Sequence, residues 1–403
     1  MSHPPQLHLS TSKFALLLAT MVAIMPFTTD IYLSAVPEMS VSLHANIHMI
    51  EKSLASFMFG VAIGQLMGGA ISDIKGRKII AIIGLLVYLF STLALLFIQT
   101  AEQLLFFRWI QALGGGMMTV TVGAVVRDFF HGREAAKMFA TIGIITLAAP
   151  LAAPMLGAML ESLGGWRIIF AFLTLYAFIV MILVWHFLPA SKFPSQPLDW
   201  KIFKKIAHNF IMVFHQREAL GFLFFQIASF SSMFVFLTES TFVYRNLYGL
   251  NAHQYAWAFG ANIITMMFFN RVTAYRLRTT APQNILVCGI LVQLISNILL
   301  VALVWTMHQP PFFLLMILIM FSVGSSGLIG SNTQACFMSY FHQVSGSANA
   351  VLGTSQFMIA AAVGWLTTEL HNGTAEIMPS MMLASTVCGI VLLWLFSRHV
   401  WQK

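Results

Sequence analysis

Charged residues are scarce in this chain. Only 8% of its 403 residues are Asp, Glu, Lys or Arg, whereas 59% are hydrophobic. A soluble globular chain carries roughly 25% charged residues, so this composition excludes an ordinary soluble domain. Apolar runs of about 20 residues recur along the whole length, and each is long enough to cross a bilayer core of about 30 Å as a helix. The composition therefore predicts an all-α membrane protein.

Several kinds of site are also missing. The three cysteines, Cys288, Cys336 and Cys388, fall inside apolar segments, which favours buried hydrophobic side chains over a disulfide framework. No His-Glu-x-x-His stretch or serine–histidine arrangement stands out, so we expect no enzyme activity, no cofactor and no metal. The net charge of +8 comes from basic residues spread over short loops, which argues against nucleic-acid binding. The first apolar run is too long for a signal-peptide core, so we expect no cleaved signal peptide.

The pattern of apolar runs predicts twelve transmembrane helices in two pseudo-symmetric bundles of six. The predicted spans lie near residues 14–36, 53–71, 79–99, 104–126, 136–160, 167–188, 219–241, 255–275, 284–306, 312–337, 348–368 and 379–397. The connections are short except for residues 189–218, where prolines are followed by a group of lysines. We expect an N-terminal bundle at 1–188, a cytoplasmic linker at 189–218 and a C-terminal bundle at 219–403.

The positions of the basic residues indicate the orientation in the membrane. Most Lys and Arg residues fall on one side of the predicted spans, for example at 75–78, at 271–278 and in the linker. Cytoplasmic loops carry such an excess. We therefore expect both ends of the chain in the cytoplasm, in a multi-pass protein of the inner (cytoplasmic) membrane surrounded by the lipid bilayer.

Short matching stretches support the division into two halves. They are Gly116 with Phe130-His131-Gly132 against Gly327 with Phe341-His342-Gln343, and Thr29-Asp30 against Thr238-Glu239. Chance matches between apolar segments are the alternative. The regular spacing favours two parallel halves related by an axis along the membrane normal.

One acid stands out in the first predicted span. Residues 21–37 read MVAIMPFTTDIYLSAVP, with Asp30 four residues after Pro26. An ionised side chain at the centre of a bilayer is penalised by about 2.5–3.5 kcal/mol, and a proline removes a backbone donor. An acid beside a helix break is therefore a candidate functional group. The alternative is that Asp30 lies near the outer interface and is solvated there.

Other polar groups also fall within or beside predicted spans. Arg108 needs a carbonyl, water or acid as a partner if it is buried, and it can also be a purely structural hydrogen-bond donor. Glu239 is proposed to face Asp30 and help bind a cationic or polar substrate, with an interfacial acid in water as the alternative. Further candidates to line a substrate cavity are Gln111, Met118, Phe234, Asn332 and Gln356. His44 and His48 are spaced for a helical metal pair, but we favour solvated side chains.

The loop after the second predicted span reads GAISDIKGRK from Gly69 to Lys78. Gly76 permits a tight turn, and Asp73 can form charge-assisted hydrogen bonds with basic residues such as Arg77. This order of residues indicates a breakable latch between the helix bundles on the cytoplasmic face. The loop resembles a signature of the major facilitator superfamily, with mild departures at Ile71, Ser72 and Ile74.

Further stretches extend the resemblance over essentially the whole chain. RWIQALG at 108–114 is similar to the pattern of the family's fourth span, and APLAAPMLGA at 149–158 resembles its antiporter signature. In the latter, Ala153 and Ala158 replace glycines. DIYLSAVP at 30–37, the Arg127-Asp128 pair and FVY at 242–244 resemble the Bcr/CflA-type drug-efflux branch.

The resemblance implies a drug/proton antiporter that works by alternating access, with a small-molecule substrate and protons as its partners. It gives Asp30 the proton-coupling role and Arg108 a supporting role. It gives the antiporter-motif residues Pro150, Pro154 and Gly157 a packing role between the halves. We expect a monomer. The alternatives are a carrier for one metabolite or siderophore, importing or exporting it, and more distantly a non-transporting receptor or a membrane-embedded enzyme.

Overall fold

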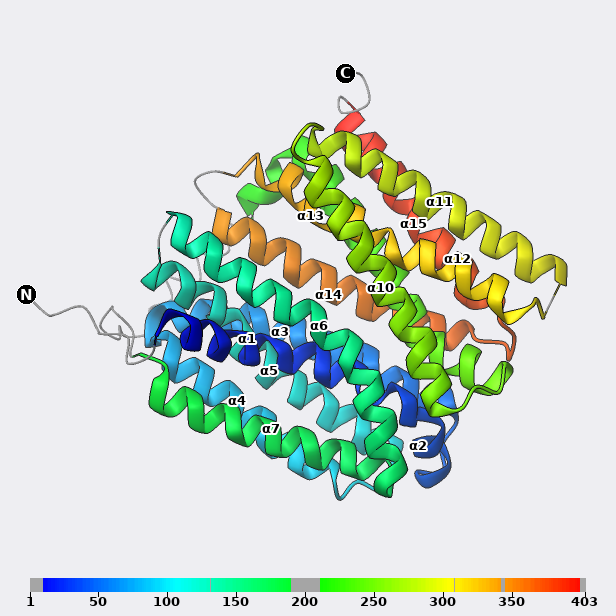
Figure 1. Ribbon diagram of the computed structural model, residues 1–403, viewed down its shortest axis with the longest axis horizontal. Coiled ribbons are helices and arrows are strands. Elements are labelled where there is room, and N and C mark those ends of the chain that lie inside the picture. Colours follow the sequence, from blue (N-terminus) through cyan, green and yellow to red (C-terminus); the bar gives the residue numbers. More distant parts are fainter. Residues whose placement is uncertain (1–9, 131, 190–210, 308, 342–344, 399–403) are drawn as a thin grey trace, which may run out of the picture. The chain divides into compact units, whose positions relative to one another are not determined.

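The computed structural model is built from helices. It describes residues 10–130, 132–189, 211–307, 309–341 and 345–398, and these ranges contain helices and turns but no β-strand. Figure 1 shows long helices joined by short connections. The all-α class predicted from composition is confirmed.

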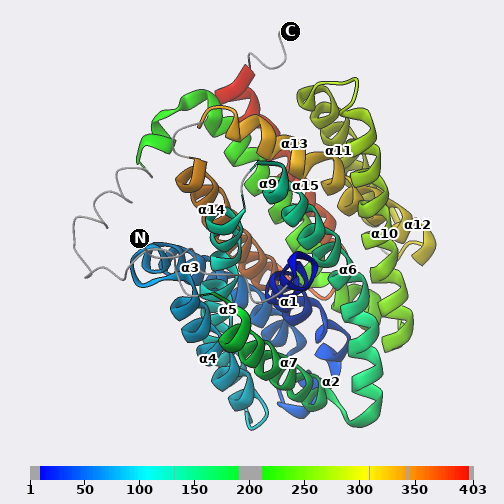
Figure 2. The same cartoon turned by 60° about the vertical axis from the view of Figure 1, so that its left-hand side comes forward.

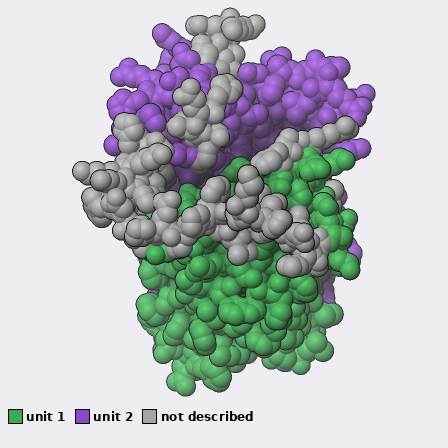
Figure 3. Space-filling view, turned by 90° about the vertical axis from the view of Figure 1, so that its left-hand side faces the viewer, with its two compact units in different colours: residues 1–46, 56–204 green, residues 47–55, 205–403 purple. Residues whose placement is uncertain are grey.

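The chain divides into two compact units, which Figure 3 draws in different colours. Unit 1 contains residues 1–46 and 56–204, and unit 2 contains residues 47–55 and 205–403. The long helix α3 (Ile47–Lys75) therefore gives its first residues to unit 2 and the rest to unit 1. Much of the predicted linker, residues 190–210, lies outside the described part of the chain, so the boundaries at 188 and 219 stay a prediction.

Unit 1 is an assembly of long helices with one interrupted helix at its start. Besides most of α3 it contains α1 (Thr11–Asp30), the 3-10 helix η1 (Leu33–Ala35), α2 (Val36–Ser42), α4 (Arg77–Leu95), α5 (Ala101–Phe129), α6 (Gly132–Gly164) and α7 (Trp166–Phe187). Helix α1 runs beside α6, and α4 packs on both α5 and α7 (Figure 1 and Figure 2). Thr100 caps α5 through a reciprocal capping box with Gln103, which satisfies two otherwise unpaired backbone donors.

Glycines let α5 approach its neighbours closely. A Cβ added to Gly114 would meet the Gly84 carbonyl of α4 at 2.5 Å, and one added to Gly116 would meet the Val61 carbonyl of α3 at 2.7 Å. These separations are below any normal Cβ contact, so only glycine permits the two helices to pack at this depth. Helix α5 is therefore held at the centre of unit 1, where it carries Arg108 and Gln111.

Unit 2 has a comparable set of long helices. It contains α9 (Arg217–Thr241), the π-helix η2 (Phe242–Leu247), α10 (Ala252–Arg276), α11 (Pro282–Met307), α12 (Phe312–Gly324), α13 (Ser326–Met338), α14 (Ser345–Leu370) and α15 (Ile377–Ser397). Helix α9 packs along α15, α14 and α13. The buried Asn297 amide donates to the Thr386 hydroxyl (2.9 Å), and its carbonyl accepts from Ser322 (2.6 Å), so this polar contact joins α11, α12 and α15.

The paired glycines of the predicted repeat occupy comparable places. Gly116 of α5 lies against the backbone of α3 in unit 1, and Gly327 of α13 lies against the Met266 carbonyl of α10 in unit 2. Both glycines admit a neighbouring helix backbone. Of the other matched residues, Phe130 and Phe341 are both buried, whereas His131, His342 and Gln343 lie outside the described residues.

Each of the twelve predicted spans coincides with helical structure, but the count of membrane spans does not reach twelve. Eleven helices of the described residues are long and apolar enough to cross a membrane. The exception is α10, which coincides with the predicted eighth span at 255–275 and carries polar residues such as Asn262, Asn270 and Arg271. Twelve spans and the cytoplasmic position of both ends therefore remain predictions.

Candidate functional site

Asp30 is the last residue of α1, at the point where regular helix stops. The chain then turns at Ile31 and Tyr32 before η1 and α2 continue. Pro26 lies inside α1, so the helix ends one turn after the proline and not at it. Asp30 is only 5% exposed, which disagrees with the alternative of an acid solvated by bulk water. Burial penalises the charged form of a carboxyl group, so such a residue needs a proton or a cation nearby.

Arg108 of α5 is fully buried in the same unit. Its Nη1 donates to the carbonyl of Thr28 (3.2 Å) and to Oε1 of Gln111 (2.9 Å). The guanidinium carbon lies 4.3 Å from the ring centre of Tyr32 and 4.2 Å from that of Phe57, so two aromatic faces stabilise its charge. Among the described residues Arg108 forms no ion pair with Asp30. The carbonyl partner agrees with the sequence expectation for a buried arginine.

Arg108 also has unused donors. Its Nε and Nη2 have no hydrogen-bond partner among the described residues although both are buried. An unpaired buried donor on a charged group is costly, typically by more than about 1–3 kcal/mol. These two nitrogens are therefore ready to bind an acceptor, which water, a carboxylate or a substrate oxygen can supply.

Hydrogen bonds from three helices hold Arg108 in place. The Gln111 amide donates to the hydroxyl of Thr92 on α4 (2.8 Å), and the hydroxyls of Thr28 and Tyr88 are 2.5 Å apart. The network links α1 immediately before Asp30, α4 and α5. Gln111 thereby serves as a support for Arg108 in addition to any contact with substrate.

The antiporter-motif helix lies directly against the segment that follows Asp30. A Cβ added to Gly157 of α6 would overlap the carbonyl oxygen of Ile31 and approach Ser34 Oγ to 3.3 Å. Pro150 and Pro154 both lie inside α6, and Pro154 is buried. The contact of Gly157 lies within unit 1, and a role between the halves stays a prediction.

The predicted latch is partly assembled in unit 1. Gly76 has a φ of 99°, which favours glycine, and it separates α3 from α4. Arg77 pairs with Asp73, and its Nε lies 3.3 Å from Oδ2 of Asp128 at the end of α5. Lys78 is half-buried and Arg127 is exposed. These contacts tie α3, α4 and α5 together, and a latch between bundles stays a prediction.

The predicted cavity-lining residues differ in their surroundings. Met118 is fully buried in the apolar core of unit 1, and Phe234 is fully buried beside Gly364, so both act as core filler here. Asn332 is buried with its amide bonded to the Leu328 carbonyl and its Oδ1 unpaired. Gln356 is half-buried and accepts from Gln226 across 3.2 Å. The two amides therefore remain better candidates than the two apolar side chains.

Glu239 has a neighbour that the sequence did not indicate. Its Oε2 lies 2.9 Å from Nδ1 of His371, which follows the end of α14, and both side chains are almost fully buried. The alternative of an interfacial acid in water disagrees with this burial. His48 and Glu51 at the start of α3 lie in the same unit, with His48 Nδ1 2.9 Å from Glu51 Oε2 and the rings of His48 and His371 3.6 Å apart.

His44 and His48 do not form a helical pair, and the expectation of solvated side chains agrees with the exposed His44 but not with His48, whose side chain is only 17% exposed and lies against Glu51. His44 is exposed with a φ of 49°, in the turn before α3 begins at Ile47, so the helical spacing argument does not apply to it. The His48–Glu51 spacing of three residues on a helix was visible in the sequence. His371 could not be found in this way because it lies more than 100 residues from its partner in sequence.

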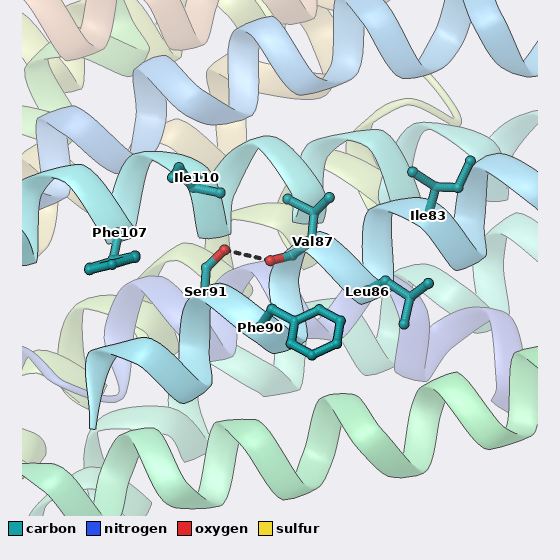
Figure 4. Close-up of a pocket in the computed structure, with 7 residues that line it drawn as sticks. All are labelled: Ile83, Leu86, Val87, Phe90, Ser91, Phe107 and Ile110. Atoms are coloured by element: carbon teal, nitrogen blue, oxygen red, sulfur yellow. Dashed lines mark hydrogen bonds between the residues drawn. The ribbon is translucent and has the colours of Figure 1, made fainter. Parts of the chain in front are cut away.

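Two surface depressions are apolar and lie away from these residues. One of about 400 Å³ lies between α4 and α5 in unit 1 (Figure 4). Its lining residues are Ile83, Leu86, Val87, Phe90, Ser91, Phe107 and Ile110. The Ser91 hydroxyl donates to the Val87 carbonyl within its own helix, so no free polar group is offered to a ligand. Another of about 470 Å³ lies among α9, α14 and α15, and its lining is also largely apolar.

Comparison with known proteins settles the family. A model of the Major Facilitator Superfamily matches residues 16–365, most of the chain. The chain belongs to the major facilitator superfamily. The match agrees with the resemblance seen in the sequence motifs, and it makes this a multi-pass membrane protein of a transporter family.

Relatives within the superfamily match over nearly the whole chain. The bicyclomycin resistance protein homolog of Haemophilus influenzae is 29% identical over 392 residues, covering 97% of this chain and 98% of the relative. The chloramphenicol resistance protein of Pseudomonas aeruginosa is 25% identical over 391 residues, covering 93% and 90%. The solved xylose transporter XylE from E. coli, in a partially occluded inward-open form, is 12% identical, with a TM-score of 0.72 and coverage of 96% and 97%. This last likeness shows the fold alone.

Proposed function

We propose that this superfamily member is a proton-coupled antiporter that exports drugs and other small amphipathic compounds from a bacterial cytoplasm by alternating access. The observation that carries the proposal is the buried Asp30 at the break after α1, beside the motif glycine Gly157 and in the same unit as the buried Arg108. The curated relatives named for resistance to bicyclomycin and chloramphenicol support drugs as the cargo class. The superfamily model supports a transport function and gives no support to an enzyme or a receptor.

Asp30 carries the proton in this mechanism. The free-energy cost of ionising a carboxyl group that is shielded from water depends on its surroundings, and bound cargo is part of those surroundings. Cargo and a proton therefore compete for Asp30. Exchange of one proton across 100 mV releases about 2.3 kcal/mol, which supports cargo gradients of several tens-fold. Arg108 keeps its charge throughout and uses its unpaired Nε and Nη2 to stabilise the deprotonated state through water or cargo oxygens.

The remaining expectations from the sequence form part of the same proposal. The protein works as a monomer in the inner membrane, with twelve spans, both ends in the cytoplasm and the loop of Asp73 and Arg77 as a latch. Its substrate contacts are Asp30, Glu239, Gln111, Asn332 and Gln356, with Met118 and Phe234 behind them. The latch is completed by Gly69, Gly76, Lys78, Arg127 and Asp128. The shape of α6 is set by Pro150, Pro154 and Gly157.

The test is proton flux driven by substrate in liposomes that contain the purified protein. With an imposed proton gradient, addition of chloramphenicol releases protons from wild-type vesicles, and Asp30→Asn abolishes this release. Glu102→Gln removes an exposed carboxylate from the same unit and serves as the matched control. Proton release that persists in Asp30→Asn contradicts the coupling role.

A carrier for a single metabolite or siderophore is the second candidate within the fold. Competition distinguishes the two functions, because a drug exporter is inhibited by chemically unrelated amphipathic compounds, whereas a dedicated carrier responds to one. If neither the proton flux nor the competition assay responds to any added compound, a non-transporting membrane protein is favoured instead.

A further inference from the structure

A cluster of two histidines and two glutamates lies at one end of three helices of unit 2. His48 and Glu51 stand in the first turns of α3, Glu239 is in the last turn of α9, and His371 follows α14. All four residues belong to the same compact unit. Their side chains are largely withdrawn from solvent, with exposed fractions of 17% for His48, 1% for Glu51, 1% for Glu239 and 3% for His371.

Each histidine is oriented by its own carboxylate. His48 Nδ1 and His371 Nδ1 each lie 2.9 Å from Oε2 of Glu51 and Glu239, respectively. In the state with both carboxylates ionised, each carboxylate only accepts hydrogen bonds, and Nδ1 of each imidazole then carries the hydrogen while Nε2 carries the lone pair. Histidines that ligate metals are held in this manner, because the carboxylate fixes the tautomer and makes the other nitrogen a better ligand.

The atoms left over in the cluster are acceptors without donors. Glu51 Oε1, Glu239 Oε1 and His371 Nε2 are buried and have no hydrogen-bond partner among the described residues. The two carboxylates are close enough to interact electrostatically. The neighbouring cation Lys52 is engaged elsewhere, since its Nζ pairs with Glu369 Oε1 at 2.6 Å. A bound cation would satisfy the acceptors and offset the charge of the two carboxylates.

The shape of the cluster fits a small ion. The ring centres of His48 and His371 lie 3.6 Å apart with their planes tilted by 35°, and the Phe242 ring lies 5.2 Å from His48 and 4.3 Å from His371. One ligand atom each from His48, Glu239 and His371 lie within 4.8 Å of one another. A tetrahedral ion with bonds of about 2.0–2.2 Å holds its ligands about 3.5 Å apart, so a closure of about 1 Å completes the set.

From this arrangement we infer that unit 2 binds a divalent transition-metal cation of the zinc type through His48, Glu239 and His371, with Glu51 as orienting residue or fourth ligand. Two imidazoles with carboxylates suit zinc and its neighbours in the first transition row, whereas magnesium and calcium prefer oxygen ligands alone. The inference does not rest on the proposed roles of Asp30 and Arg108, because all four residues of the cluster belong to unit 2 and only Glu239 is shared with the proposed substrate contacts.

The test uses the full-length protein with its affinity tag removed, reconstituted in lipid nanodiscs and stripped with a chelator. Titration calorimetry with Zn²⁺ alone gives one ion per chain. Glu239→Gln and His371→Gln lower the affinity by at least about tenfold, as is usual when a ligand or its orienting group is lost. The Zn²⁺ affinity is unchanged in Asp30→Asn and in His186→Gln, which replaces an exposed histidine of unit 1.

A second measurement separates a built site from surface binding. Co²⁺ in place of Zn²⁺ gives the intense visible absorption of a tetrahedral ion. Added metal raises the melting temperature of the wild type and not that of the variants that lack the site. The stripped variants are compared with stripped wild type to show that they fold. Two results would overturn the inference. One is a wild-type Zn²⁺ affinity no higher than that of a His48→Gln/His371→Gln double variant, and the other is the weak absorption of an octahedral Co²⁺ ion. Either result leaves two structural histidine–glutamate pairs. Failure of chloramphenicol-driven proton flux does not affect this result.

Discussion

Units 1 and 2 each place a buried acid at the end of their first long helix, and they give it different neighbours. Asp30 ends α1, and the chain continues through the 3-10 helix η1. Glu239 lies in the last turn of α9, and the chain continues through the π-helix η2. Departures from regular helix at comparable points agree with the Thr-Asp and Thr-Glu match between the halves.

The partners of the two acids separate their roles. Glu239 is held by His371, inside a cluster that contains a second carboxylate. Asp30 has no cationic partner among the described residues, and the nearby arginine of unit 1 is held by a carbonyl, an amide and two aromatic rings. A carboxyl without a fixed cationic partner can exchange a proton for cargo, whereas one tied to an imidazole suits a resident cation or a structural contact.

Neutralising each acid in turn is the strongest test of this comparison. Asp30→Asn abolishes accumulation against a gradient, because the step that converts about 2.3 kcal/mol per 100 mV into cargo movement is lost. Glu239→Gln retains accumulation of chloramphenicol against a gradient. Uptake of chloramphenicol into inverted vesicles measures both, and equal loss in the two variants contradicts the division of roles.

Arg108→Lys is the next largest change. Lysine keeps the charge but cannot lie flat between Tyr32 and Phe57 while donating to Thr28 and Gln111. Loss of one charge-assisted hydrogen bond costs about 1.5–3 kcal/mol, so kcat/KM for transport falls by about 10- to 100-fold.

Arg167→Lys is the control for this change, because this exposed arginine also donates to carbonyls and stacks on Trp166. An equal fall of kcat/KM in Arg108→Lys and Arg167→Lys would contradict the importance of the buried contacts of Arg108 for transport.

Gly157→Ala tests the contact of α6 with the segment after Asp30. The added methyl group overlaps the Ile31 carbonyl, and overpacking of this kind costs about 1–3 kcal/mol. We expect a lower melting temperature and slower transport. Gly143→Ala, on the same helix with no atom within 4 Å, is expected to be neutral or slightly stabilising. A melting temperature that is unchanged in Gly157→Ala contradicts the close contact.

Substrate charge distinguishes the contribution of Glu239. If this acid attracts cationic cargo, Glu239→Gln raises the KM for ethidium roughly fivefold, equivalent to about 1 kcal/mol, and leaves the KM for neutral chloramphenicol unchanged. Transport rates measured over a range of concentrations give both values. Equal KM values for wild type and variant with both compounds remove Glu239 from the substrate site.

The smallest expected effect compares the helix caps of the two units. Thr100 caps α5 and Asn251 caps α10, each through a reciprocal capping box. Thr100→Ala and Asn251→Ala should each cost about 0.5–2 kcal/mol of stability without changing substrate preference. Thermal unfolding in detergent measures the loss, and a change in drug specificity would be unexpected.

The fold was predicted from local patterns because those patterns are strong in this chain. Apolar runs of membrane length coincide with eleven helices of the described residues, and Gly76 separates α3 from α4 within the Asp73–Arg77 stretch, which is otherwise helical. Helix α10 shows the limit of this reasoning. It forms a long helix despite its polar residues, because neighbouring helices bury Asn262 in a way that hydropathy cannot register.

The candidate site was predicted only in part. Asp30 and Arg108 were singled out because a charge in an apolar span is conspicuous, and both are buried in the structure, while their roles stay predictions. The cation–π partners Tyr32 and Phe57 were missed, since they lie on different helices from Arg108. Met118 and Phe234 were chosen for their chemistry alone, and both are fully buried, Met118 in the apolar core of unit 1 and Phe234 beside Gly364.

The sequence by itself determined that this chain forms membrane-length helices of the major facilitator superfamily and carries an acid where an apolar helix is interrupted. Those properties follow from composition and from short motifs, which act over one or two turns. Only the tertiary structure decided which polar groups meet, bringing Arg108 to the Thr28 carbonyl and His371 to Glu239. Such contacts join residues far apart along the chain, and they depend on how glycine-lined helices pack, which no local pattern specifies.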